Sequence, residues 1–182
     1  MRSGWNEAEP KQARKLRQKD LDARWTKKNN ETHYGYKNHA KVDRDSKMIV
    51  DYKVTSANVH DSRPFADLID ETDQDIWADS AYVGEELEAS IKAKNPKIKL
   101  HIIEKGYKNK PLTDEQKASN REKSRIRCRV EHVFEVMTQS MEAMMVRTIG
   151  KARAEREIAM KNLAYNLKRY VFLSTAKNQK CG

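Results

Sequence analysis

Residues 73–86 read DQDIWADSAYVGEE and place an acidic residue directly after a short apolar run. The triplet IWA at 76–78 has the composition of a buried strand, and Gly84 interrupts regular structure before a helical pattern begins. Ligands of open α/β sheets gather at the carboxyl ends of the strands, so Asp79 is well placed to face such a crevice. Its position alone favours the plainer interpretation, a turn or a helix cap.

Strand and helix patterns alternate on both sides of this stretch. Turn-forming residues at 43–47 join two strand patterns, which favours an antiparallel hairpin. A helix is expected over 62–70, with Asp61 or Ser62 as its cap, and another over 84–95. The four strands predicted from these patterns cover 33–43, 48–54, 75–79 and 97–105.

Helical periodicity dominates the last third of the chain. One helix is expected over 113–145 and a second, after Gly150, over 151–173. Apolar residues recur along one face of the first helix, namely Ile126, Val130, Val133, Met137 and Met141. A stripe with this spacing faces a protein core.

The order of elements predicts an α/β fold in which helices flank a mixed sheet. Two strands come first, then helices and strands alternate, and two helices close the chain. Several folds share this order. The ribonuclease-H-like fold is one of them, if one further strand precedes the hairpin.

Charge favours a polyanionic partner. The 182 residues carry 37 Lys and Arg against 27 Asp and Glu, a net charge of +10. A basic protein without such a partner is the alternative. Cys128 and Cys181 form no disulfide framework, and the absence of a signal peptide or a long apolar run predicts a cytoplasmic protein.

Glu131 is a second candidate for chemistry. It borders the apolar stripe of its helix, so it is expected to face the body of the protein. Arg127, four residues earlier, is able to orient its carboxylate. An ordinary ion pair on a half-exposed helix is the alternative interpretation of the two residues.

Three segments together resemble the DDE transposases of bacterial insertion sequences, specifically the insertion sequence 5 type. They are WADSAYVG at 77–84, NREKSRIRCRVEHVFEVM at 120–137 and RTIGKARAEREIAMKNLAYNLKRY at 147–170. Two earlier segments, ARWTKKNNETHYGYKNHAKVD and VTSANVHDSRPF, resemble the part of the family that precedes its second catalytic acid. The resemblance spans about residues 22 to 173.

The resemblance implies a ribonuclease-H-like core in which two Asp and one Glu bind two divalent ions, Mg²⁺ or Mn²⁺. Asp79 matches the second acid and Glu131 the third, so both are expected to be catalytic and to bind metal. Arg127 matches the arginine of the family signature Tyr-x2-Arg-x3-Glu-x6-Lys, and it is expected to support the acids. Ser124 and Thr138 replace the tyrosine and the lysine of that signature.

The family's first acid has no evident counterpart. Asp20 and Asp22 lie in a basic segment without a preceding apolar run. We therefore expect a basic arm or linker over 1–30, an incomplete catalytic domain over 31–173 that lacks the first core strand, and a flexible tail over 174–182. Two carboxylates are too few to hold two ions, so this chain alone is expected to be weakly active or inactive.

Basic residues ahead of Glu131 are candidates for contacts with the DNA backbone. Residues 105–129 contain nine Lys and Arg against three Asp and Glu. The candidates are Lys105, Lys108, Lys110, Arg121, Lys123 and Arg125. A solvated helix face is an equally good explanation for any one of them. His132 is a candidate to support the acids, and a packed helical histidine is the alternative.

The sequence thus predicts an insertion-sequence transposase that cleaves double-stranded DNA at the ends of an element and joins it to a target. The implied partners are DNA and a second transposase chain, either as a homo-oligomer or by pairing with a full-length transposase. The implied location is the nucleoid in the bacterial cytoplasm. The alternative is a non-catalytic fragment that binds DNA or pairs with intact transposase and so inhibits transposition.

Overall fold

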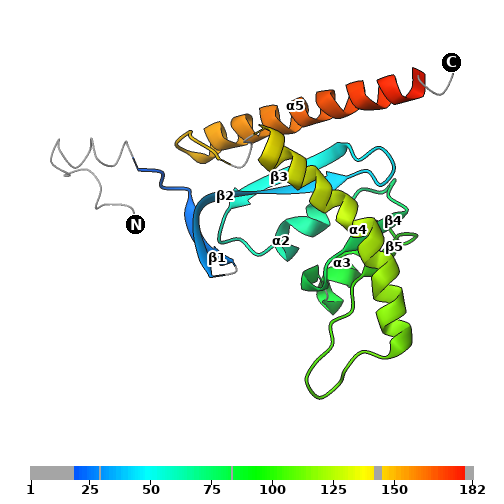
Figure 1. The fold of residues 1–182 in the computed structure, drawn as a ribbon. Helices are drawn as coiled ribbons and strands as arrows, with labels where there is room; N and C mark the ends of the chain where they lie inside the picture. Colours follow the sequence, from blue (N-terminus) through cyan, green and yellow to red (C-terminus); the bar gives the residue numbers. More distant parts are fainter. Residues whose placement is uncertain (1–18, 29, 83, 142–144, 179–182) are drawn as a thin grey trace, which may run out of the picture.

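The computed structural model describes residues 19–28, 30–82, 84–141 and 145–178 (Figure 1). Its first sheet has three antiparallel strands in the order β1 (Arg24–Lys28), β2 (Glu31–Val42) and β3 (Ile49–Ser56). The first part of β2 pairs with β1 as far as Gly35, and the rest pairs with β3. The expected hairpin is therefore present, extended by one strand.

The second sheet holds two parallel strands, β4 (Asp75–Ala78) and β5 (Lys99–Ile102). Helix α3 (Glu85–Lys94) connects them as a crossover. The segment before β4 forms a short helix α2 (Ser62–Phe65) and a 3₁₀ turn η1 (Ala66–Leu68), and a second 3₁₀ turn η2 (Ser80–Tyr82) follows β4.

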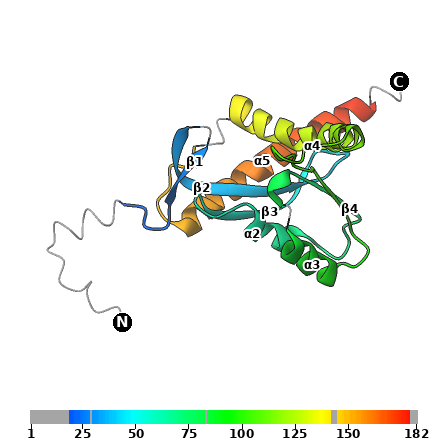
Figure 2. The same cartoon turned by 90° about the horizontal axis from the view of Figure 1, so that it is seen from below.

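Two long helices complete the fold, α4 (Asp114–Met141) and α5 (Lys151–Asn178). Thr113 and Gln116 begin α4 with reciprocal side-chain to backbone hydrogen bonds, which form a capping box. Both helices cover one side of the hairpin, and α2 and α3 lie on the other side (Figure 2). None of the helices in the described ranges is long and apolar enough to cross a membrane.

Alternation along β2 separates its two faces. Ala40 and Val42 pack on a core of Ile49, Val133, Met137 and Tyr165, which lies under α4 and α5. Lys37, His39 and Lys41 point to the other side, where Lys37 meets Asp61 and Lys41 meets Asp73. A second, smaller core of Ile69, Ile91 and Ile98 lies between α3 and the β4–β5 pair.

The structure differs from the expected single mixed sheet. Among the described residues, no strand joins β2 to β4, so the antiparallel and parallel strands form two separate sheets. Within the described ranges, the edge of β2 that carries β1 is unpaired from Tyr36 to Val42, and β4 pairs only with β5. The ionic contact of 2.6 Å between Lys41 and Asp73 shows that the two sheets are close neighbours.

Both ends of the expected domain also need correction. Arg24–Lys28 is not part of an arm, because it pairs with β2 as strand β1. Helix α5 continues to Asn178, so residues 174–178 are helical and do not belong to a flexible tail. Residues 1–18 and 179–182, the rest of the predicted arm and tail, lie outside the described residues.

The helix predicted over 62–70 is shorter than expected and is capped differently. Asp61 makes no side-chain capping bond; its carboxylate accepts a hydrogen bond from Lys37 Nζ at 2.9 Å. The ring of His60 takes over the capping role, since its Nδ1 accepts a hydrogen bond from the Ser62 N–H at 3.3 Å. The helical turn then tightens to 3₁₀ and ends at Leu68.

Candidate active site

Asp79 follows the last residue of β4 and lies at the carboxyl end of the parallel pair. Its Oδ1 accepts a hydrogen bond from the Ser80 N–H at 2.7 Å, and its backbone oxygen accepts one from the Tyr82 N–H at 3.0 Å. The side chain therefore begins the turn, as the plainer interpretation predicts. Its second oxygen, Oδ2, remains available for a longer-range partner.

Arg127 on α4 is that partner. Its Nη1 lies 3.3 Å from Asp79 Oδ2, and its Nη2 lies 2.8 Å from Glu131 Oε1. One guanidinium thus joins two acids that are 52 positions apart in the chain. The side chains of Asp79 and Glu131 are 47% and 60% exposed, whereas that of Arg127 is 31% exposed. The two acids are therefore accessible to solvent, and the arginine that joins them is half-buried.

The guanidinium has two effects on the acids. It neutralises part of the repulsion between the two carboxylates, and its planar fork fixes the direction in which each oxygen points. Its Nε is buried and has no hydrogen-bond partner among the described residues. The cluster is consequently able to present two oriented carboxylates to a cation, or a guanidinium to an anion.

Tyr82 forms one border of this cluster. Its ring packs on Phe65 with 4.4 Å between ring centroids. Burial, together with the negative charges of Asp61 and Asp79, raises the pKa of Tyr82 to about 12, while the positive charge of Arg127 acts in the opposite direction. The phenol therefore stays neutral near pH 7. Because the charges of both Asp61 and Asp79 act on Tyr82, Asp61 also contributes to the electrostatics around the site.

The metal implied by the family resemblance requires a larger donor set. Carboxylate oxygens are the ligands that Mg²⁺ and Mn²⁺ prefer. In the described part of the chain, no three acidic, His or Cys side chains gather closely enough to hold an ion. Arg127 also lies between the two acids with a charge of its own. These residues by themselves do not fit a two-ion site.

His132, which was expected to support the acids, points elsewhere. Its Nδ1 lies 3.9 Å from Glu135 Oε2 on the same helix, and the side chain is half exposed. Within the described ranges it has no ion pair or hydrogen bond with Asp79, Arg127 or Glu131. Adjacent positions on a helix project about 100° apart, which explains why the neighbour of Glu131 misses the cluster.

Five of the six predicted DNA contacts are exposed, and one is not. Lys123 on α4 donates a hydrogen bond to the Ile102 carbonyl at 2.9 Å and lies 3.7 Å from Glu104, so it ties α4 to the end of β5. The exposed residues are Lys105, Lys108, Lys110, Arg121 and Arg125. They lie on the loop before α4 and on its N-terminal half, which leads directly to Glu131.

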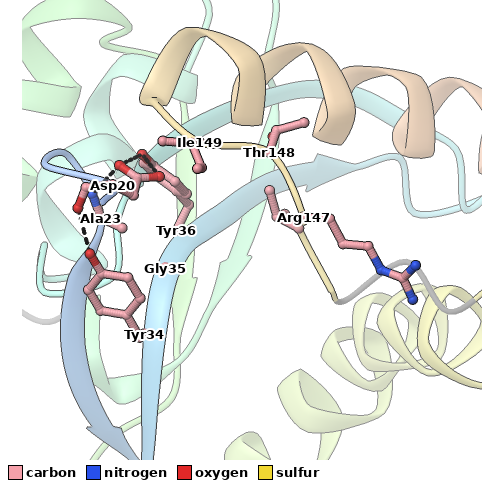
Figure 3. A pocket seen from close by; sticks show the side chains of 9 residues that line it. Asp20, Ala23, Tyr34, Gly35, Tyr36, Arg147, Thr148 and Ile149 are labelled. Carbon is pink, nitrogen blue, oxygen red and sulfur yellow. Dashed lines mark hydrogen bonds between the residues drawn. The ribbon is translucent and has the colours of Figure 1, made fainter. Parts of the chain in front are cut away.

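Asp20 is the residue whose importance the sequence did not reveal. Its carboxylate accepts hydrogen bonds from the hydroxyl of Tyr36 and from the backbone N–H groups of Asp22, Ala23 and Gly150, at 2.8–3.0 Å (Figure 3). It thereby fastens the start of β1 to β2 and to the α4–α5 connection. Only the fold brings Gly150 near Asp20, so no local pattern was available to indicate this role.

The hydrogen bonds of Asp20 outweigh the effect of its burial. Burial alone would raise the pKa of Asp20, but the bonds from Gly150, Tyr36, Ala23 and Asp22 lower it below the ordinary value of 3.8. The carboxylate lines a cavity of about 300 Å³ together with Tyr34 and Arg147. The Tyr34 hydroxyl donates a hydrogen bond to the Asp20 carbonyl at 2.6 Å. Hydrogen bonds among Asp20, Tyr34 and Tyr36 therefore fix one wall of the cavity.

Known proteins of one class are similar in sequence to this chain. A curated relative, the "Transposase for insertion sequence element IS1106" of Neisseria meningitidis serogroup B, is 28% identical over 151 residues. The match covers 82% of this chain and 51% of the relative, so the chain spans about half the length of that protein. No solved structure matches. The family model described as "Transposase DDE domain" matches residues 11–167, and the chain belongs to that family.

Proposed function

We propose that these residues form part of the catalytic domain of an insertion-sequence transposase of the insertion sequence 5 type. In this proposal Asp79 and Glu131 are catalytic carboxylates for metal-dependent cleavage and transfer of DNA strands. The observation that carries the proposal is the bridge made by Arg127, which holds both acids at the carboxyl end of β4. The carboxyl ends of the strands are the usual ligand edge of an open α/β sheet, which supports a shared role for the two acids.

The other residues of the site have roles that follow from their positions. Arg127 positions the two carboxylates and limits their mutual repulsion. Lys105, Lys108, Lys110, Arg121 and Arg125 form an exposed basic surface that neutralises DNA phosphates without reading the sequence. Because this surface continues along α4 toward Glu131, it is suited to lead a duplex to the acids. The proposed place of action is the chromosome in the bacterial cytoplasm.

The edges of β2 and β4 that are unpaired among the described residues support a ribonuclease-H-like arrangement completed by one more strand. The free edge of β2 runs from Tyr36 to Val42, and β4 carries Asp79 at its end. Unpaired strand edges are open to further pairing. A strand between them would join the two sheets, and an Asp at its end would supply the third carboxylate that two ions require.

The 182 residues alone are accordingly expected to cleave DNA weakly or not at all. The test is nicking of supercoiled DNA that carries the ends of the element, with Mg²⁺ or Mn²⁺, by the chain alone and by a version extended at its N-terminus with a strand ending in Asp. We expect the extension to restore cleavage. Cleavage that stays absent in a well-folded extended chain would contradict the proposed role of that strand.

Substitutions in the extended chain test the two acids directly. Asp79→Asn and Glu131→Gln remove charge while keeping shape, and each is expected to lower the rate at least about 100-fold if the group acts in the transition state. Glu135→Gln, one turn further along α4, is the matched control and should leave the rate unchanged. Equal rates for Asp79→Asn and Glu135→Gln would remove Asp79 from the mechanism.

The alternative function is inhibition without catalysis, by binding DNA or by pairing with intact transposase. The exposed basic surface favours DNA binding, and the apolar surface of α5 described below favours pairing. A gel-shift series at increasing salt measures the first. The second is measured by adding the chain to a complete transposase: a fall in transposition that Asp79→Asn does not relieve indicates inhibition that is independent of the acids.

A further inference from the structure

Helix α5 is apolar on two opposite sides. Its inner side packs on the hairpin through Ala154, Ile158 and Tyr165, which are buried. Its outer side carries a second stripe whose first four members are spaced by three, four and three residues, with a fifth member four residues after the third, and each of them is 50–64% exposed. The members of this outer stripe are Met160, Leu163, Leu167, Tyr170 and Val171. An apolar stripe along one side of a helix normally packs against a neighbouring element.

A groove runs beside the stripe. It has a volume of about 300 Å³ and lies between α5 and the edge strand β3. Val50 and Tyr52 of β3, 57% and 38% exposed, form one wall, and Leu163 forms part of the other. Leu163 belongs to both the outer stripe and the groove, so the two form one surface, which is mainly apolar and includes the polar side chains of Asp51, Asn162 and Asn166 in the groove.

We propose that this surface pairs with a second copy of the same chain, with the two α5 helices antiparallel. The alternating spacing of the stripe is that of a helix–helix seam, so it selects a helix as its partner. The stripe extends from Met160 to Val171, which places the two-fold axis near residues 165–166. Each Tyr170 then lies beside the groove of the other copy, so the surface is complementary to itself, as a two-fold interface requires.

The area of the surface fits this partner. The exposed surface area of the outer stripe, together with that of Val50 and Tyr52, is roughly 700 Å² per copy. Burying this area on two copies approaches the size of a standard stable interface, about 1,600 Å². A contiguous apolar patch of this size is larger than the largest patch on a typical monomeric protein, which measures about 300–600 Å². The inference deepens the pairing part of the proposed function, and it does not require the chain to be catalytic.

The first test is the molecular mass in solution, measured by sedimentation velocity across a range of concentrations. We expect a dimer for the unmodified chain and at least about a 100-fold weaker association for Leu163→Glu/Leu167→Glu, since two charges enter the seam of each copy. Ala118→Glu/Thr138→Glu, at exposed positions of α4, adds the same charge and should leave the dimer intact. A folded chain that stays monomeric at about 100 µM, or a dimer indifferent to the α5 substitutions, would overturn the proposal.

Disulfide cross-linking supplies a second test that does not depend on a destabilised variant. In a background with Cys128→Ser and Cys181→Ser, a Met160→Cys chain is mixed with a Val171→Cys chain under mild oxidation. Antiparallel pairing predicts cross-linked dimers in the mixture and few in either chain alone. Cross-linking of Met160→Cys with itself would show a different packing and overturn the antiparallel arrangement. The pairing and the catalytic proposal can fail separately. If the extended chain nicks DNA in a way that depends on Asp79 but stays monomeric, the pairing through α5 is wrong and the catalytic proposal stands.

Discussion

The two sheets are held to their helices in different ways. The hairpin unit (β1–β3, α5 and the C-terminal half of α4) has its apolar core and, in addition, several hydrogen bonds from α5 to strand and turn backbone. Asn166 bonds both the N–H and the carbonyl of Ile49, and Tyr165 and Arg169 donate to the carbonyls of Lys47 and Ser46. The long α5 is therefore fixed in register on the hairpin.

The parallel unit (β4, β5, α2, η1 and α3) has a smaller core and one dominant polar anchor. The buried Asn95 donates hydrogen bonds to the carbonyls of Asp70, Glu71 and Asp73, which closes the loop before β4. Several ion pairs join the two units, namely Lys37–Asp61, Lys41–Asp73, Lys53–Asp67 and Arg127–Asp79. The acids thus lie at a junction, and the distance between them depends on how firmly the units hold each other.

The largest expected effect comes from opening the core of the parallel unit. Ile91 is fully buried, so Ile91→Ala should cost about 2–5 kcal/mol in the free energy of unfolding. If the units are loosely joined, β4, β5 and α3 lose hydrogen-exchange protection while β2, β3 and α5 keep theirs. Val133→Ala, in the other core, is the matched change. Uniform loss of protection in both variants would show that the molecule unfolds as one body.

The hydrogen bonds that the Asp20 carboxylate accepts from Tyr36, Asp22, Ala23 and Gly150 make the stability of the hairpin unit sensitive to acid. The pKa of Asp20 is lowered in the folded state, so its contribution to stability is present above the ordinary value of 3.8 and is lost as the pH falls through the folded pKa. Asp20→Asn should cost about 2 kcal/mol at pH 7, because several hydrogen bonds to a charged group weaken together. Denaturant titrations at pH 7 and at pH 3 measure both effects. The difference between the variant and the unmodified chain should shrink at the lower pH.

The strong periodic patterns predicted the framework correctly. The stripe on α4, the turn at 43–47, the crossover helix and the strand before Asp79 all depend on local spacing, and each is present. The sequence also paired Arg127 with Glu131, since residues four apart on a helix are neighbours. Strand β1 was missed because its residues, RWTKK, are mostly polar and gain their place only by pairing with β2.

Contacts between distant segments were the part that the sequence left open. Lys123 resembles its basic neighbours in every local respect, and only the position of β5 beneath it turns it into a structural residue. Likewise Asp20 looks like an ordinary acid in a basic segment until Gly150 is brought beside it. Local composition carries no information about such partners, because they depend on how two elements pack.

Removing the Arg127 bridge tests the junction with a smaller effect. Each exposed ion pair contributes at most about 1 kcal/mol, so Arg127→Gln should change stability little. It should, however, raise the affinity for Mn²⁺ by about threefold to tenfold, since a cation no longer competes with the guanidinium for Asp79 and Glu131. Titration calorimetry or Mn²⁺ electron paramagnetic resonance measures the change. Arg129→Gln, whose Nη1 bonds the Arg44 carbonyl, is the matched control. A weaker affinity in Arg127→Gln would mean that orientation of the carboxylates outweighs competition.

The smallest effects distinguish the exposed lysines from the partly buried Lys123. Replacing Lys105, Lys108 and Lys110 together by Gln should reduce the dependence of DNA affinity on salt by up to about three phosphate contacts, and it should leave stability nearly unchanged. Lys123→Gln should do the reverse, with no change in the salt dependence and a loss of about 1 kcal/mol in stability, because its bond to the Ile102 carbonyl joins α4 to β5. Gel shifts at several salt concentrations, paired with denaturant titrations, distinguish the two. If Lys123→Gln alters the salt dependence, Lys123 itself contacts a phosphate, and its bond to the Ile102 carbonyl is not its main role.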